Sequence, residues 1–205
     1  MTLKALAFNC SLKSSQQGKS SSTQVLLEQL VAALGELDVT SEIVRAADYD
    51  IKPGTDHDMG EGDAWPALRE KLLAADIVII GTPIWIGQPS SVAKRVLERI
   101  DAFIEELDDN KRMPTFGKVG LVAVVGNEDG AHHAAAEIWQ AMVELGFSLP
   151  PSALTYWVGE AMTGKEYSEF AKPPEKVAIA TAMAAAGGAH LAKLLKNSPY
   201  PGVEK

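Results

Sequence analysis

The feature that most constrains the fold is a continuously apolar run in the middle of the chain, residues 76–81 (DIVIIG). A strand that is apolar on both faces is typical of the centre of a parallel sheet covered by helices on either side. Parallel strands need a crossover between them, usually a helix, and strand-like and helix-like patterns alternate five times in this sequence. We therefore predict an α/β fold in which five parallel strands carry helices on both faces.

The pattern of apolar residues gives the limits of these elements. The strands are expected at residues 3–8, 39–44, 76–81, 118–125 and 149–158. The helices are expected at residues 24–34, 64–74, 90–107, 131–145 and 175 to about 196. We read residues 82–89 and 126–130 as loops, and residues 48–63 as an irregular acidic segment.

The length of 205 residues fits one folded unit. We assign residues 1–196 to a single domain and expect residues 197–205, which contain two prolines and a glycine, to form a loose C-terminal tail. No internal repeat and no long linker divides the chain.

Composition excludes several classes of function. The net charge of −8 argues against a nucleic-acid partner, which would be held through its phosphates. The single cysteine, Cys10, rules out an internal disulfide and fits a reducing compartment. The N-terminus does not resemble a secretory signal. The apolar tract 177–195 contains two glycines, His190 and Lys193, so we predict an amphipathic helix, no membrane partner and a cytoplasmic location.

Metal binding is not expected. His57 stands between Asp56 and Asp58, but no second histidine or cysteine lies nearby at the spacing of metal ligands. We therefore predict no metal site.

The loop after the first strand, residues 9–23 (NCSLKSSQQGKSSST), is rich in hydroxyl groups and leads into a helix. The amides at a helix N-terminus and its partial positive charge favour an anion. We interpret this loop as a phosphate cradle, although a polar surface loop with a serine N-cap would read the same way. The loops at residues 82–89 and 126–130 follow parallel strands too, so all three should converge at one edge of the sheet.

Three known phosphate sites fit this loop poorly. A dinucleotide site of the Rossmann type needs three glycines, and the loop has only Gly18. Gly18-Lys19-Ser20 is half of a P-loop, because Lys13 occupies the place of its first glycine. A tyrosine phosphatase loop built on Cys10 would need an arginine at residue 16, which is Gln16. Cys10 is better explained as a small buried residue.

Three stretches resemble the flavodoxin-like NAD(P)H-dependent FMN reductases and quinone reductases. They are the first loop from Cys10 to Thr23, the second loop Thr82 to Ser90 (TPIWIGQPS), and the glycine-containing third loop Gly126 to Gly130. The resemblance covers residues 3 to about 146 and implies a flavodoxin-like three-layer sandwich. The sequence departs from the family pattern at Cys10, where glycine is usual, at Lys13, where arginine is commoner, and in six extra residues, 14–19.

The resemblance implies FMN as the cofactor and NAD(P)H as the hydride donor. The phosphate would be held by the first loop, with Lys13 or Lys19 as countercharge, and the isoalloxazine ring by the other two loops. The resemblance does not say which serine of the 20–22 run meets the phosphate, nor what residues 156–162 do. The implied cofactor-binding residues are Ser11, Lys13, Ser21, Ser22, Thr23, Pro83, Ile84, Trp85, Ile86, Gly87, Asn127, Glu128, Asp129 and Gly130.

Two residues have an ordinary alternative explanation. His133 begins a helix beside the expected ring edge, so we name it as the candidate catalytic residue that donates a proton or hydrogen bond to the acceptor; an exposed histidine at a helix start is the alternative. Trp85 is an expected ring contact, and the alternative is an ordinary core or interface residue.

The function implied is an FMN-dependent oxidoreductase that reduces a quinone, free flavin or similar small-molecule acceptor. Members of the family that the sequence resembles usually place the flavin near a subunit interface, so a homodimer or homotetramer is expected by analogy. Two alternatives remain open. One is a flavodoxin-type electron carrier without its own NAD(P)H turnover, and the other is a non-enzymatic nucleotide-binding α/β module.

Overall fold

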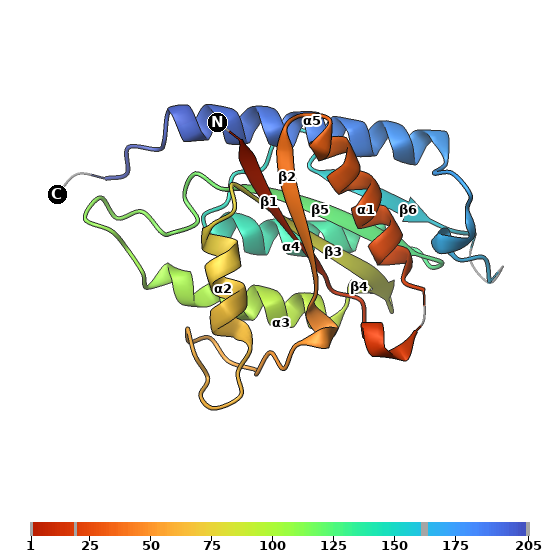
Figure 1. Cartoon of the computed structure of the whole chain (residues 1–205), viewed down its shortest axis with the longest axis horizontal. Helices are drawn as coiled ribbons and strands as arrows, with labels where there is room; N and C mark the ends of the chain where they lie inside the picture. Colours follow the sequence, from red (N-terminus) through yellow and green to blue (C-terminus); the bar gives the residue numbers. More distant parts are fainter. Residues whose placement is uncertain (1, 19, 161–163, 204–205) are drawn as a thin grey trace.

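Figure 1 shows the computed structural model of the chain, which describes residues 2–18, 20–160 and 164–203. The main sheet has parallel strands in the order β2-β1-β3-β5-β6, which confirms the predicted five-stranded parallel sheet. The chain changes direction across the sheet between β1 and β3, where open α/β sheets bind ligands. The strands are β1 Leu3–Asn9, β2 Val39–Arg45, β3 Ile77–Trp85, β5 Val119–Gly126 and β6 Leu154–Val158.

Helices cover both faces of the sheet, as predicted (Figure 1). Along β3, Ile77 and Ile79 belong to one apolar core while Val78 and Ile80 belong to the other, which explains why this strand is apolar throughout. The first core lies under α1 Ser22–Gly35 and α5 Glu175–Asn197. The second lies under α2 Trp65–Leu73, α3 Ser91–Ile100 and α4 Ala131–Glu144.

Among the described residues, α5 is the one helix that could cross a membrane by length and composition alone. In the structure one side of α5 packs against α1, β5 and β6, and Val177, Ala184 and Leu195 are buried there. A core helix passes the same test of length and composition, so α5 gives weak evidence for a membrane.

Residues 82–89, predicted as a loop, contain strand structure. β3 continues to Trp85 because Thr82 and Pro83 still pair with Val124 and Val125 of β5. The chain then turns and forms a short antiparallel strand, β4 Gln88–Pro89, so that the two strands make a hairpin. The alternation of polar and apolar residues is too short here to distinguish a hairpin from a loop.

Two predicted elements are shorter than expected. The helix expected at 90–107 is α-helical only over Ser91–Ile100, and a 3-10 turn at Asp101–Ile104 continues its apolar stripe. The strand expected at 149–158 begins at Leu154, after Pro150, Pro151 and the left-handed Ser152. Proline cannot donate to the ladder of backbone hydrogen bonds, so this entry stays outside the sheet.

The acidic segment, residues 48–63, is fixed by one buried arginine. Arg99 is fully buried, and its guanidinium lies 2.8 Å from the Asp63 carboxylate and donates to the carbonyls of Lys52 and Asp56 at 2.9 and 2.8 Å. Burial by itself would raise the pKa of Asp63, but hydrogen bonds from the Met59, Trp65 and Lys52 amides and from Arg99 hold this pKa below its usual value. The segment is therefore irregular but firmly held.

The tail contacts the rest of the chain more than its composition suggests. Asn197 still belongs to α5. The Tyr200 ring meets Phe116 edge-on at 6.2 Å, and its carbonyl accepts from Arg112 at 3.1 Å. The Val203 amide donates to the Asn110 carbonyl at 2.9 Å. Residues 199–203 thus lie against the 108–116 loop.

Candidate functional site

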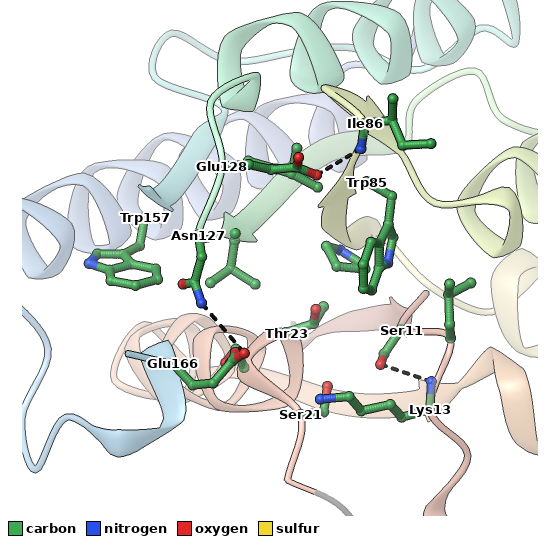
Figure 2. A pocket seen from close by; sticks show the side chains of 16 residues that line it. Ser11, Lys13, Ser21, Thr23, Trp85, Ile86, Asn127, Glu128, Trp157 and Glu166 are labelled. Carbon is green, nitrogen blue, oxygen red and sulfur yellow. Dashed lines mark hydrogen bonds between the residues drawn. The ribbon is translucent and has the colours of Figure 1, made fainter. Parts of the chain in front are cut away.

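The three loops converge on one pocket of about 390 Å³ at the carboxyl ends of β1, β3 and β5 (Figure 2). This volume lies in the range of small-molecule and cofactor sites. Most of the residues proposed from the sequence are present, and Gly87, Asp129, Gly130 and His133 are not among those that line it. The lining residues are Ser11, Leu12, Lys13, Ser21, Ser22, Thr23, Pro83, Ile84, Trp85, Ile86, Val125, Gly126, Asn127, Glu128, Trp157 and Glu166.

Buried polar side chains fix the first loop against its neighbours. Asn9, which is fully buried, accepts from the Ser11 amide at 3.0 Å and donates to Gln24 at 2.7 Å. Ser90 donates to the Cys10 carbonyl at 2.6 Å, and its amide donates to Thr82 at 3.0 Å. These bonds tie the end of β1 to α1 and to the hairpin, so the pocket floor is rigid.

One end of the pocket brings together hydroxyl groups, the N-terminus of α1 and a lysine. Ser21 is the N-cap of α1 and accepts from the Gln24 amide at 3.2 Å, while Ser11 accepts from the Lys13 amide at 3.1 Å. Each hydroxyl keeps its proton for a ligand. The Lys13 ammonium lies 3.4 Å from the Ser20 carbonyl, beside the positive end of α1. Lys19, the other possible countercharge, lies outside the described residues.

Ser22 is placed differently from the other cradle residues. Its hydroxyl donates to the Glu166 carboxylate at 3.0 Å, and its oxygen accepts from the Ser168 amide at 3.3 Å. A serine has one hydroxyl proton, so the proton of Ser22 is directed at Glu166. Thr23 is buried and still lines the pocket.

The other end of the pocket is apolar and aromatic. Pro83, Ile84 and Trp85 come from the last residues of β3, and Ile86 stands at the tip of the hairpin. Figure 2 shows Trp85 and Trp157 on opposite sides of the space between the loops. Trp85 is 49% exposed, so it is not a core residue in this chain. A flat ring would have aromatic and aliphatic surface to lie against here.

Gly87 and Gly130 contact each other instead of lining the pocket. A Cβ added to Gly130, whose φ is +124°, would lie 2.8 Å from the Cα of Gly87. A glycine at residue 130 therefore allows the hairpin tip and the third loop to come so close. Asp129 is exposed and accepts from the Gly130 amide at 2.7 Å.

Glu128 joins the same two loops. Its carboxylate accepts from the Ile86 amide at 2.7 Å (Figure 2). Ile86 itself has a φ of 56° and its side chain is 90% exposed. The hairpin tip is therefore held through its backbone, while its side chain faces outward.

His133 lies on α4 outside the pocket lining. Its Nε2 atom is 2.8 Å from the side-chain nitrogen (Nε2) of Gln88 and 2.8 Å from a carboxylate oxygen of Glu137. Its role in catalysis stays a prediction.

His57, beside Asp56 and Asp58, pairs with Glu106 at 3.1 Å. Within the described ranges, no three His, Cys, Asp or Glu side chains are grouped to hold a metal ion.

Cys10 is fully buried behind the first loop, and its thiol lies 3.7 Å from the Phe8 carbonyl. Burial raises the pKa of the Cys10 thiol far above its usual value. A thiol kept protonated in this way is a poor nucleophile. The structure therefore supports the interpretation of Cys10 as a small core residue.

Sequence reasoning missed five lining residues. Leu12, Val125 and Gly126 lie within two residues of predicted positions. Trp157 could have been found, because it stands at the carboxyl end of β6, the edge where the other loops meet. Glu166 had no such signal: it belongs to the strap, residues 164–170, whose sequence has neither helical nor strand periodicity.

Comparisons with known proteins agree with this geometry. Residues 3–161 match the sequence model of the NADPH-dependent FMN reductase family. The 8-demethyl-8-aminoriboflavin-5′-phosphate synthase of Streptomyces davaonensis is 36% identical over 98% of this chain and 81% of its own length. The divalent metal cation transporter MntH of Mycobacterium bovis is 38% identical over 80% of this chain, which spans only 24% of that relative.

Solved structures share the fold. RosB, crystallised with the intermediate 8-demethyl-8-formylriboflavin-5′-phosphate, superposes with a TM-score of 0.87 at 35% identity, covering 98% of this chain and 82% of its own. The apo form of the NADH:FMN oxidoreductase EMOB superposes with a TM-score of 0.68 at 18% identity, covering 99% and 95%. The fold, the pocket and the match over residues 3–161 lead to one conclusion: the chain belongs to the NADPH-dependent FMN reductase family of flavodoxin-like oxidoreductases.

Proposed function

We propose that this chain binds FMN in the 390 Å³ pocket and uses it to pass electrons from NAD(P)H to a small acceptor such as a quinone or free flavin. The observation that carries the proposal is the polarity of the pocket: one end offers hydroxyls, a helix N-terminus and Lys13, and the other offers a flat apolar wall at Trp85. FMN has a phosphate at one end and a flat ring at the other.

The residues present fit this group. The Ser11 and Ser21 hydroxyls and the Lys13 ammonium would hold the phosphate. Pro83, Ile84 and Trp85 would cover one side of the ring. When bound, FMN supplies the hydride-accepting chemistry, while the protein excludes water from the ring and fixes its orientation.

The proposal extends to partners and location. We infer a homodimer or homotetramer, a cytoplasmic protein, and no nucleic-acid or membrane partner. The exposed Trp85 and Ile86 side chains at the mouth of the pocket support an assembly or an acceptor that covers them.

The first test is the absorbance spectrum of the purified protein with and without added FMN, followed by oxidation of NADH and NADPH with a quinone as acceptor. Lys13→Met should weaken FMN binding about tenfold and leave riboflavin binding unchanged, because only FMN carries the phosphate. Lys94→Met, on α3, is the matched control. FMN binding without NAD(P)H turnover would favour the alternative of an electron carrier. If the protein binds no flavin, the remaining alternative is the non-enzymatic nucleotide-binding module.

A second candidate is that the flavin phosphate is the substrate and not a resident cofactor. Its support is the 36% identity to the synthase over nearly the whole chain, together with the flavin phosphate bound in the RosB structure. Mass spectrometry of FMN recovered after aerobic incubation with the protein separates the two. An unchanged mass supports a cofactor, and a changed mass supports a substrate.

A further inference from the structure

We propose that Glu166 selects for the polyol chain that joins a flavin ring to its phosphate. This inference rests on the proposed binding of FMN and adds a specificity-determining residue to it. Glu166 lies past residue 161, where the match to the family ends, so family membership assigns it no role. It is nevertheless part of the pocket lining.

The position of Glu166 is the first support. One of its carboxylate oxygens accepts from Ser22, in the phosphate cradle, at 3.0 Å. The other lies 3.5 Å from the side-chain nitrogen of Asn127, in the third loop (Figure 2). The carboxylate therefore stands between the anion end and the ring end of the pocket. In FMN the part between phosphate and ring is the ribityl chain.

The strap holds Glu166 in this position. The neighbouring Tyr167 is buried, and its hydroxyl donates to Gln29 of α1 at 2.6 Å. The Tyr167 ring also lies 5.3 Å from Trp157, which lines the pocket. Glu166 and Glu169 cap each other's backbone amides in a capping box. These anchors make the carboxylate a fixed wall of the pocket.

The chemistry of a carboxylate matches a polyol. An ionised carboxylate only accepts hydrogen bonds and has room for about four, of which Ser22, Asn127 and the Glu169 backbone amide use three. A hydroxyl group of a sugar-like chain can donate to the remaining site in a charge-assisted bond. The same negative charge repels phosphate, so it directs the phosphate toward Lys13, which enters the pocket from another side (Figure 2).

The experiment compares three ligands on four proteins. FMN, riboflavin and lumiflavin share the ring; riboflavin lacks the phosphate, and lumiflavin lacks both the phosphate and the polyol. Their dissociation constants are measured by fluorescence titration for the unchanged protein, Glu166→Ala, Glu166→Gln and Glu169→Gln. The last is a matched control on the strap that removes the same charge and keeps an oxygen for the Glu166 amide.

We expect Glu166→Ala to weaken FMN and riboflavin by tenfold or more, on the order of one charge-assisted hydrogen bond. The dissociation constant of lumiflavin should change less than about twofold in Glu166→Ala. For FMN and riboflavin, Glu166→Gln should have dissociation constants between those of Glu166→Ala and the unchanged protein, and Glu169→Gln should bind like the unchanged protein. Thermal unfolding of each variant shows that it is folded.

Three results would overturn the inference. Tighter FMN binding by Glu166→Ala would mean that the carboxylate competes with the phosphate. Weaker FMN binding with unchanged riboflavin binding would mean that Glu166 acts on the phosphate. An equal loss of affinity for lumiflavin would mean that Glu166 contributes to the pocket wall in general and does not recognise the polyol. Failure of the proposed FMN binding looks different, because the unchanged protein would then bind no FMN at all, and the role of Glu166 would fall with it. Failure of NAD(P)H turnover alone would leave the FMN affinities, and so this test, unaffected.

Discussion

Two irregular segments, residues 48–63 and the strap, look alike in sequence but are held by opposite means. The acidic segment is fixed by a buried charge, through Arg99 and Asp63, and none of its residues is among those that line the pocket. The strap is fixed by rings, through Tyr167, Trp157 and Phe170, and keeps its charge, on Glu166, for the pocket. A buried charge must be satisfied by its own neighbours, so only the second arrangement leaves a carboxylate available to a ligand.

The largest effect is expected from Arg99→Met. It leaves Asp63 buried and unpaired and frees the carbonyls of Lys52 and Asp56, which should cost about 3–5 kcal/mol of unfolding free energy. Urea denaturation measures it. The matched control is Arg95→Met on the same helix, where one hydrogen bond to Ile51 is lost and about 1 kcal/mol is expected.

The double variant Asp63→Asn/Arg99→Met sharpens this test, because asparagine removes the charge and keeps an oxygen for the Lys52 and Trp65 amides. If the cost of the single change comes from an unpaired buried charge, the double variant should recover part of it. FMN affinity of the folded protein should stay the same in both, because the pair lies outside the pocket lining. A loss of FMN affinity in folded Arg99→Met would show that the acidic segment does shape the pocket.

A smaller effect should appear with pH. The pKa of Asp63 is lowered in the folded protein from its usual 3.8, so the unfolded chain binds the proton first as the pH falls. The stability that ionised Asp63 contributes is complete above about pH 4 and is lost as the pH falls through the lower, folded pKa. Asp63→Asn should show a flatter decline in unfolding free energy below pH 4; an identical slope would contradict this.

For the strap, Tyr167→Phe removes the hydrogen bond to Gln29 and keeps the ring. We expect a loss of about 1 kcal/mol, seen as faster amide hydrogen exchange in the strap. Tyr156→Phe is the matched control. It also removes one tyrosine hydroxyl, but the Tyr156 ring packs edge-on against His132 of α4 at 4.9 Å and not against the strap. Equal exchange rates in Tyr167→Phe and the unchanged protein would mean that the rings alone hold the strap.

The smallest effect is expected at Cys10, where a buried, protonated thiol should not react with iodoacetamide in the folded protein at pH 8. The thiol should react once urea unfolds the chain, because it is then exposed and its pKa returns to normal. Labelling of the native protein at the rate of a free thiol would show that the first loop opens far enough to expose Cys10 to solvent.

The sheet and most of the pocket could be predicted from the sequence, because apolar runs such as 76–81 mark strands and the carboxyl ends of parallel strands must share an edge. The convergence of the loops that carry Ser11, Trp85 and Asn127 follows from that rule, and the family resemblance named these residues. Glu166 could not be predicted, since its place depends on the contact of Tyr167 with Gln29, 138 residues away in the sequence, and on ring packing against Trp157. The hairpin at β4 was missed for a related reason: its two residues are too few to show a period.

The contact between Gly87 and Gly130 has a consequence for the width of the ring end. Because the backbones of the hairpin tip and the third loop touch there without side chains between them, the distance between these two segments is set by backbone contact. A single methyl group at residue 130 would act as a wedge and push the hairpin away from the third loop. Such a wedge would be detected as faster release of bound flavin in stopped-flow dilution, with the opposite end of the cavity untouched.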